Sequence, residues 1–308
     1  MLDYHLHLWP HGQSDTAPTL EVVAAYCERA ALAGVTEIAL TEHLFRFAQA
    51  DDLLHGFWDD EPDLALRDSM AAYWNDHARA DLDAYVECVV AAKDAGLPVV
   101  LGLEVDFYRG RMDQVAQLLS GYPFDVLLGS VHWLGSWRFD DLGDDLSMAQ
   151  WSAREIDAAW EDYVCAIEEL ADSGVCDVLA HPDLIKVEGH CPLAPGEWWD
   201  RIVQAAVSSG MAAELSSAGW RKPVAEAYPS PPLLARLVDS GVPLTTASDA
   251  HRLPDVADRA ADLRGLLAGV GVDTLRGFRQ RLPVEVSVGV VDEVPAGSSN
   301  PNLNRKLR

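Results

Sequence analysis

Cysteine is scarce in this chain of 308 residues, and none of its five copies belongs to a CxxC pair. An odd number of widely spaced thiols fits reduced cysteines in a cytoplasm better than a disulfide framework. No signal peptide precedes the first candidate site residue, which stands at position 5. We therefore expect a cytoplasmic protein that does not depend on disulfide bonds.

Positive charge is also scarce, because 23 Lys and Arg residues stand against 49 Asp and Glu residues and give a formal net charge of −26. Nucleic-acid-binding proteins normally carry a basic stripe, and its absence argues against a nucleic-acid partner. A small anionic substrate remains compatible, because bound metal and a few local cations can reverse the sign of the potential inside a cleft. No apolar run reaches the roughly 18 residues of a membrane span, so we expect no membrane partner.

No nucleotide-binding loop of the GxGxxG or Walker type is present, and no GxSxG elbow supports a serine triad. The chain instead alternates short β-rich runs with longer amphipathic stretches, which predicts parallel strands joined by crossover helices. Seven or eight such units suit a closed α/β barrel better than an open sheet. Strands are expected at Leu2–Leu8, Thr36–Thr41, Val99–Val105, Asp125–Val131, Val175–Ala180, Ala212–Leu215 and Pro243–Ala247, with an eighth at Val284–Val288 that closes or flanks the sheet. Helices are expected at Leu20–Leu32, Leu82–Ala95, Trp151–Ala171 and Trp198–Ser208.

Two regions depart from this alternation. Residues from about 45 to 80 are too long for a plain loop, and we interpret them as an insertion after the second strand that covers the site. Residues 291–308 have a loop-like composition and are predicted to form a C-terminal tail without a function. The remainder, residues 1–290, is predicted to be a single domain that contains the insertion.

Seven of the ten histidines stand near the ends of predicted strands. Residues two apart on a strand point to the same face, so His5 and His7 can bind one ion together, as can Asp249 and His251. In an α/β barrel the carboxyl ends of the strands meet at one mouth, where catalytic residues lie. Histidines that merely cap strands are the alternative for any one position, but they do not explain the set. The candidate metal ligands are His5, His7, His11, His43, Glu104, His132, His181, Asp249 and His251.

Nine ligands exceed what one tetrahedral ion binds, so the residues predict two or three ions that share a bridging carboxylate. Glu104 is the natural bridge, because a carboxylate offers two oxygens whereas an imidazole offers one free nitrogen. A set of donors rich in nitrogen favours zinc, iron or manganese over magnesium or calcium. The residues by themselves therefore predict a multinuclear metal hydrolase.

The ordered motifs resemble those of the polymerase-and-histidinol-phosphatase (PHP) family, and within it the histidinol-phosphate phosphatase branch. They run from His5 to about residue 257 and include Thr41–His43, Gly102–Asp106, Ser130–His132, Ala180–Lys186 and Ser248–His251. The resemblance implies a distorted TIM-like (β/α)7 barrel with a trinuclear centre. It places His5, His7, Glu104 and Asp249 on a first ion, Glu104, His132 and His181 on a second, and His11, His43 and His251 on a third. The stretch between His7 and His11 is shorter than the family pattern, so Asp15 is the alternative to His11.

The same resemblance implies a metal-dependent phosphomonoesterase, with L-histidinol phosphate as the expected substrate and a metal-bridging hydroxide as the nucleophile. Asp183 and Asp106 are expected to orient a ligand or transfer a proton, and a purely hydrogen-bonding role is the alternative for each. Glu214 either receives a substrate ammonium or pairs with Arg221 as a buried acid. The candidate phosphate contacts, each of which is alternatively a surface cation, are Arg221, Lys222, Lys186 and Arg252.

Three other functions stay open at this stage. A PHP-type phosphoesterase could act on another small phosphorylated metabolite, a nucleotide or a cyclic phosphate. An amidohydrolase-type barrel shares the HxH motif and the late aspartate, but it usually lacks the arrangement of Glu104 and His132. A non-catalytic barrel stabilised by metal would have lost several ligands, whereas this chain keeps them all.

Overall fold

A computed structural model describes residues 1–10 and 17–289 of the chain. Its main sheet consists of seven parallel strands whose spatial order follows their order in the sequence. Each of the seven predicted strands is present, and the predicted α/β barrel is confirmed. The strands are β1 (Leu2–Leu6), β2 (Glu37–Leu40), β3 (Val99–Asp106), β4 (Val126–Ser130), β5 (Val178–Leu179), β6 (Ala212–Ser216) and β7 (Leu244–Ala247).

The first and last strands of this sheet meet and nearly close it into a barrel. Leu6 and Ala250 form a parallel bridge, and the backbone N–H of His7 donates to the carbonyl of Ala250 at 2.8 Å. The hydroxyl of Thr246 donates to the carbonyl of Leu2 at 2.6 Å. Strand β1, which carries His5 and leads into His7, therefore lies beside β7, which leads into Asp249.

A buried carboxylate fastens this seam. Asp3 accepts hydrogen bonds from the backbone N–H and the hydroxyl of Ser248, both at 2.7 Å, and from the backbone N–H of Ala257 at 2.9 Å. Burial raises the pKa of Asp3 to about 6, although the donors of Ser248 and Ala257 oppose the rise. Asp3 of β1 thus accepts hydrogen bonds from two backbone N–H groups that follow β7, which would otherwise be buried without a partner.

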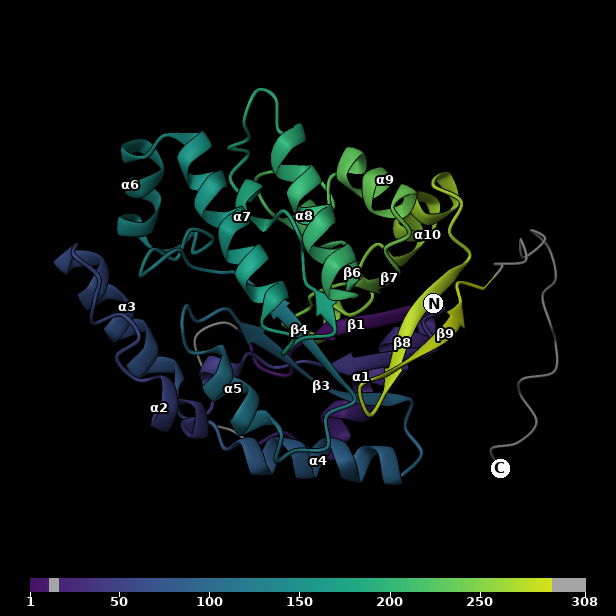
Figure 1. Ribbon diagram of the computed structural model, residues 1–308. Helices are drawn as coiled ribbons and strands as arrows, with labels where there is room; N and C mark the ends of the chain where they lie inside the picture. The colour runs from purple at the N-terminus through teal and green to yellow at the C-terminus, as the bar shows by residue number, and fades with distance from the viewer. Residues whose placement is uncertain (11–16, 290–308) are drawn as a thin grey trace, which may run out of the picture.

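Helices cover the outside of the barrel, with α7, α8 and α9 on one side of the strands and α4 and α5 on the other (Figure 1). The expected helix at Trp151–Ala171 is two helices, because Arg154 between them has extended backbone angles. The helices are α1 (Leu20–Leu32), α2 (Ala48–Leu54), α3 (Leu64–His77), α4 (Leu82–Asp94), α5 (Met112–Leu119), α6 (Asp145–Ala153), α7 (Ile156–Asp172), α8 (Gly196–Ser209), α9 (Pro231–Asp239) and α10 (Ala260–Gly269). Four single turns of 3-10 helix follow strands, at Leu44–Arg46, Leu184–Lys186, Ala218–Arg221 and Leu253–Asp255.

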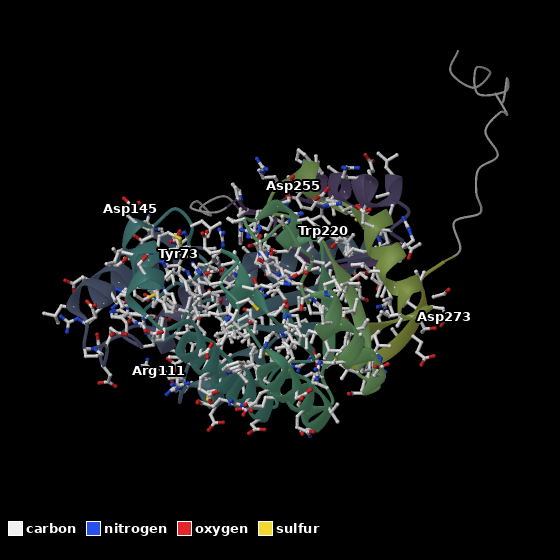
Figure 2. The ribbon with its side chains drawn as sticks, turned by 90° about the horizontal axis from the view of Figure 1, so that it is seen from above. Tyr73, Arg111, Asp145, Trp220, Asp255 and Asp273 are labelled. Carbon is white, nitrogen blue, oxygen red and sulfur yellow. The ribbon has the colours of Figure 1, made fainter. Side chains whose placement is uncertain are left out.

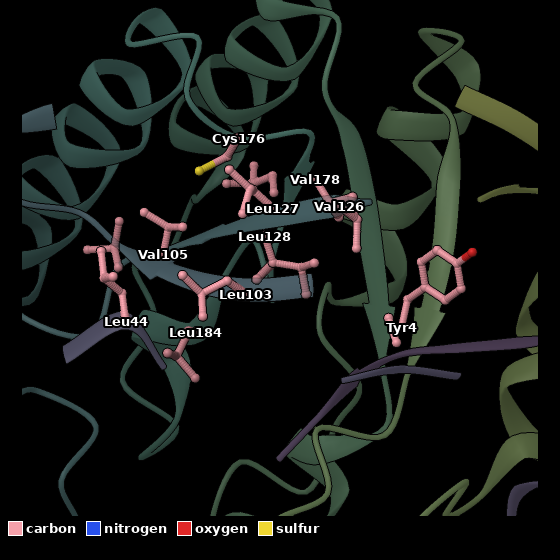
Figure 3. Packing of buried hydrophobic residues seen from close by; sticks show 14 of the residues in the cluster. Tyr4, Leu44, Leu103, Val105, Val126, Leu127, Leu128, Cys176, Val178 and Leu184 are labelled. Carbon is pink, nitrogen blue, oxygen red and sulfur yellow. The ribbon is translucent and has the colours of Figure 1, made fainter. Parts of the chain in front are cut away.

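The strands read as continuous apolar runs because both of their faces are covered. All eight residues of β3 are buried. Leu103 and Val105 alternate with Glu104 and Asp106 along this strand, and successive side chains of a strand point to opposite faces. Figure 3 shows Leu103 and Val105 in one apolar cluster with residues such as Leu128 of β4. The two acids therefore point to the opposite face, toward the inside of the barrel.

A separate antiparallel hairpin flanks the barrel. It consists of β8 (Thr274–Arg279) and β9 (Leu282–Ser287), so the eighth predicted strand flanks the sheet and does not close it. Gln280 and Arg281 connect the two strands with positive φ angles of 50° and 66°, as a tight hairpin turn requires. Seen from above in Figure 2, Asp273 beside this hairpin lies at the other end of the molecule from Tyr73 of α3.

The segment interpreted as an insertion contains the first 3-10 turn and helices α2 and α3. Its two ends meet in a bridge between Phe47 and Ala80, and Ala48 N–H donates to the carbonyl of Ala80 at 2.9 Å. The assignment of this segment as an insertion and of residues 1–290 as a single domain stays a prediction, and the predicted tail lies outside the described residues. All five cysteines are described and unpaired. Within residues 1–10 and 17–289, every helix is too short or too polar to cross a membrane.

Candidate metal centre

Glu104 of β3 is buried at the centre of the predicted ligands. Its Oε2 lies 2.7 Å from His43 Nδ1, and its Oε1 lies 3.0 Å from His181 Nε2. A parallel bridge between His43 and Glu104 holds the end of β2 beside this strand. Each of five imidazoles has a ring nitrogen within 3.5 Å of the carboxylate, and they belong to His5, His7, His43, His132 and His181.

Asp249, just after β7, approaches the cluster from the other side of the seam. Its Oδ1 lies 3.5 Å from His7 Nε2, 3.9 Å from His5 Nε2 and 3.5 Å from His251 Nδ1. Eight of the nine predicted ligands therefore gather at one mouth of the barrel. The ninth, His11, and its alternative Asp15 lie outside the described residues.

The donors fall into groups whose atoms lie within 4.8 Å of one another. Two groups overlap the first and third expected ion sites, with His7 common to both. Glu104 and His181 of the second expected site form a group with His5, whereas His132 is grouped with His43 and Asp106. These four groups are His5, His7 and Asp249; His7, His43 and His251; His5, Glu104 and His181; and His43, Asp106 and His132.

The state of the buried nitrogens fits metal binding. Nε2 of His5, Nε2 of His7 and Nδ1 of His43 are buried and lie near Glu104 Oε2, but among the described residues none of them has a partner with hydrogen-bond geometry. A buried polar atom without a partner costs about 1–3 kcal/mol, so such atoms rarely cluster without a reason. Cations bound among them would supply the missing partners. The free energy of metal binding would then stabilise the folded state.

The electrostatics of the centre favour an ionised carboxylate. Burial opposes ionisation of Glu104, but the facing imidazoles of His43 and His5 hold its pKa well below the usual range. Burial likewise keeps the pKa of His43 well below its usual value, which leaves the neutral ring that a metal requires. Burial would also lower the pKa of His5, but Glu104 and Glu214 raise it well above the usual value. The same negative charge that holds a proton on His5 attracts a metal cation.

Backbone strain coincides with two of the ligands. His181 after β5 and Asp249 after β7 have φ angles of 26° and 49°, in the left-handed region that side chains other than glycine avoid. Such positions cost about 1–3 kcal/mol and persist where the surroundings enforce them. At Asp249 the guanidinium of Arg221 donates to the carbonyls of Ser248 at 2.6 Å and of Asp249 at 3.1 Å, which holds the turn.

Further carboxylates hold the ligands from behind. Asp106 Oδ1 lies 2.7 Å from His132 Nδ1, a position that fits the hydrogen-bonding role expected as the alternative for this residue. Glu214 is buried, and its Oε2 lies 2.8 Å from His5 Nδ1. Neither expectation for Glu214 fits this position, since the acid pairs with a ligand and not with Arg221, and it does not line the cavity.

Glu42, which follows β2 and precedes His43, is a further buried acid of the site that was not among the predicted residues. Its Oε1 accepts the backbone N–H of Trp9 at 3.0 Å, and its Oε2 lies 3.5 Å from His7 Nδ1. An acid beside a predicted ligand at the end of a strand was the available signal. Glu42 thus places a negative charge beside His7, although at 3.5 Å it does not form the hydrogen bond that Asp106 forms with His132.

Asp183 and Lys186 lie behind the wall of the site. Asp183 Oδ2 accepts the backbone N–H of Ser230 at 2.8 Å and lies 3.1 Å from Lys186 Nζ. The lysine also donates to Glu226 at 2.6 Å and to the carbonyl of Ala227 at 2.8 Å. Both are buried and do not line the cavity, so we no longer propose Asp183 as a catalytic residue or Lys186 as a phosphate contact.

A cavity of about 550 Å³ lies over the metal centre. Arg221, Lys222 and Arg252 line it, as the sequence analysis expected of phosphate contacts. The segment 45–80 contributes one wall through aromatic side chains such as Phe45 and Tyr73. The cavity is therefore large enough for a small organic phosphate and combines an apolar wall with cationic groups.

Known proteins share the sequence and the fold. The PHP domain model matches residues 3–218. A protein from Deinococcus radiodurans named "Probable histidinol-phosphatase" is 31% identical over 281 residues, which cover 91% of this chain and 97% of the relative. A crystal structure of a candidate histidinol phosphatase from Listeria monocytogenes is similar with a TM-score of 0.68 and 20% identity, and covers 85% of this chain and 99% of that one.

A second solved structure is the histidinol phosphate phosphatase from Lactococcus lactis subsp. lactis, complexed with zinc, L-histidinol and phosphate. It is similar with a TM-score of 0.66 and 19% identity, over 92% of this chain and 98% of that one. At these identities the two solved structures establish the barrel fold. Together with the domain match and the curated relative, they confirm the resemblance seen in the motifs: the chain belongs to the PHP family.

Proposed function

We propose that this protein is a metal-dependent phosphomonoesterase that hydrolyses L-histidinol phosphate to histidinol and inorganic phosphate. The observation that carries the proposal is the convergence of seven predicted metal ligands around Glu104, five of which line a cavity together with cationic side chains. The relative from D. radiodurans, named for this activity, supports the substrate. So does the solved neighbour complexed with L-histidinol and phosphate.

Two or three divalent ions, of zinc, iron or manganese, fit the donor set. His5, His7 and Asp249 would hold one, Glu104 with His181 and His132 a second, and His43 with His251 a third, for which His11 stays a predicted ligand. When bound, such ions lower the pKa of a water molecule and neutralise the phosphoryl oxygens of the ester.

The protein's own groups contribute position and charge. Asp106 and Glu214 hold the rings of His132 and His5 by hydrogen bonds, so that the free ring nitrogens face Glu104. Glu42 lies 3.5 Å from His7 and adds negative charge beside that ring. Arg221 and Lys222 line the cavity where a phosphate group would enter. An arginine offers forked donors that match two phosphate oxygens, and a lysine offers a compact charge.

The negative charge of the chain supports a small substrate. With a net charge of −26, extended contact with a polyanion would be unfavourable. The cavity of about 550 Å³ instead suits a single small phosphate ester. A cytoplasmic location stays part of the proposal and rests on the cysteine content.

A phosphate-release screen tests the proposal. The purified protein, with its metal content measured on the same sample, is offered L-histidinol phosphate and a panel of other phosphate esters. We expect histidinol phosphate to be hydrolysed with the highest kcat/KM and a chelator to abolish the activity. Rapid hydrolysis of another ester without hydrolysis of histidinol phosphate would contradict the substrate but keep the reaction class.

A further inference from the structure

One carboxylate in the cavity forms no close ion pair within the described residues. Asp140 lies in the loop between β4 and α6, beyond His132, and lines the cavity. Across residues 1–10 and 17–289, no side chain forms a hydrogen bond or an ion pair with its carboxylate. Burial raises the pKa of Asp140, while the positive charges of His132 and Lys222 pull it down. The acid therefore lines the same cavity as His132 and Lys222 but forms a close ion pair with neither.

The other charges of the cavity wall are matched in pairs. Arg252 lies 2.9 Å from Asp255, Arg221 lies 3.0 Å from Asp258, and Arg138 contacts both Asp141 and Asp144. Two charged side chains of this wall, Asp140 and Lys222, form no ion pair with any residue in the described part of the chain. Asp140 and Lys222 therefore influence each other across the cavity, but neither is held in a close ion pair.

The position of Asp140 is fixed in advance by its neighbours. Phe139 before it is buried, and its carbonyl accepts the indole N–H of Trp151 at 3.1 Å. Asp141 after it is held by Arg138, whose guanidinium also lies 4.5 Å over the ring of Tyr73. A loop anchored on both sides presents its carboxylate with little further loss of conformational entropy on binding.

The proposed substrate carries groups that match this wall. L-Histidinol phosphate has a primary ammonium on the carbon next to the one that bears the phosphate ester. Its imidazole is largely neutral at neutral pH, since an unperturbed imidazole has a pKa of about 6.5. With the phosphate at the metal centre, the ammonium would lie only a few bonds away, within the cavity that Asp140 also lines.

We propose that Asp140 is a specificity-determining residue that binds the ammonium group of the substrate. This inference rests on the proposed function. An ammonium supplies the counter-charge that Asp140 lacks, whereas a substrate without an amine leaves a partly desolvated carboxylate unpaired. Sites built around a polar partner reject analogues that lack it, because the protein group is then left without a partner.

The test compares two esters in the metal-loaded enzyme. One is L-histidinol phosphate and the other is its analogue without the amine, 3-(imidazol-4-yl)propyl phosphate. We expect Asp140→Asn to lower kcat/KM for the first by about 30-fold, as expected for the loss of one partner of a desolvated charge pair. The deaminated ester should be hydrolysed by the variant nearly as well as by the wild type. Asp140→Glu, which keeps the charge, should recover part of the preference for the amine.

Asp145→Asn is the matched control, because this exposed residue at the start of α6 removes the same charge five positions away. Asp145→Asn should leave unchanged the ratio of kcat/KM for L-histidinol phosphate to kcat/KM for the deaminated ester. An equal loss on both esters in Asp140→Asn would overturn the inference, because the residue would then serve the phosphate, the leaving oxygen or the fold. An unchanged preference in Asp140→Asn would overturn it as well.

The same data separate this inference from the proposed function. A wild-type enzyme that releases no phosphate from histidinol phosphate overturns both. An active wild type whose preference for the amine survives in Asp140→Asn overturns only the role of Asp140.

Discussion

The floor and the rim of the cavity differ in how their charges are held. We call the eight described candidate metal ligands, with Glu42, Asp106 and Glu214, the floor, and Arg138, Asp140, Arg221, Lys222 and Arg252 the rim. Floor residues come from strands or the positions just after them, and orienting acids such as Asp106 lie within hydrogen-bond distance of a ligand. Rim residues come from loops, and the arginines among them pair with aspartates nearby.

We therefore expect the floor to determine the reaction and the rim to determine which substrate is preferred. The register of the barrel sets the floor, so a change there alters the metal ions and the reaction itself. The loops set the rim, where most ion pairs are partly solvated and individually weak. Substitutions in the two regions should therefore differ in the size of their effects and in the quantity that they change.

The largest effect is expected at the centre of the floor. Glu104→Gln replaces the carboxylate that faces five imidazoles with a neutral amide. Loss of an orienting residue behind a ligand typically costs 10- to 100-fold, so loss of the shared ligand should lower phosphate release by more than about 100-fold. Metal analysis and steady-state kinetics measure the result.

The control for this change is Glu285→Gln, at an exposed position of β9 in the hairpin. It should retain full metal content and activity. A Glu104→Gln protein that keeps its metal and hydrolyses the substrate like the wild type would show that the floor is not the site of the reaction.

A smaller effect is expected behind the floor. Asp106→Asn keeps an oxygen that can accept a hydrogen bond from His132 but removes the charge that raises the basicity of the ring. We expect metal affinity to fall by about 10-fold, the lower end of the range for orienting carboxylates. Titration with a competing chelator measures the affinity.

Asp125→Asn is a matched comparison, because Asp125 is an equally buried aspartate just before β4, at the opposite end of the barrel. Its carboxylate contacts Lys93 and accepts the backbone N–H of Leu101 at 3.0 Å. This change should lower the thermal stability and leave metal affinity unaltered. If Asp106→Asn and Asp125→Asn lowered the metal affinity equally, the loss in Asp106→Asn would come from lower stability and not from a misoriented His132.

The smallest effect is expected at the rim. Arg252 has a side chain that is 70% exposed and pairs with Asp255. Because exposed pairs contribute little, Arg252→Ala should change kcat/KM for histidinol phosphate by less than about threefold. A much larger loss in steady-state kinetics would show that Arg252 leaves its aspartate to bind the phosphate.

The sequence indicated which side chains gather in the floor better than it indicated the contacts of the rim, for a physical reason. The alternation of side chains along a strand is local, so pairs such as His5 and His7 are assigned to one face from their spacing. The closed barrel then brings the strand ends together. The contacts of Lys186 with Glu226 or of Arg138 with Ser69 join residues 40 and 69 positions apart, and no local pattern encodes them.

The same limit explains the errors in the fold. The helix expected at Trp151–Ala171 breaks at Arg154 although its composition is helical on both sides. Strand β8 was not expected, because a hairpin strand with polar residues such as Arg276 and Arg279 lacks the apolar run of the barrel strands. Asp140 carries no signal of its own, since an acid in a loop is the commonest of surface features.

The fastening of Asp3 to Ser248 has a consequence for how the protein is made. The two residues are 245 positions apart in the chain. During synthesis from the amino terminus, the earliest histidines emerge long before the aspartate and the histidine at 249 and 251 exist. The complete ion-binding cluster thus forms only after nearly the whole barrel has left the ribosome, and a chain stopped short of its seventh strand carries most of the donors without a site.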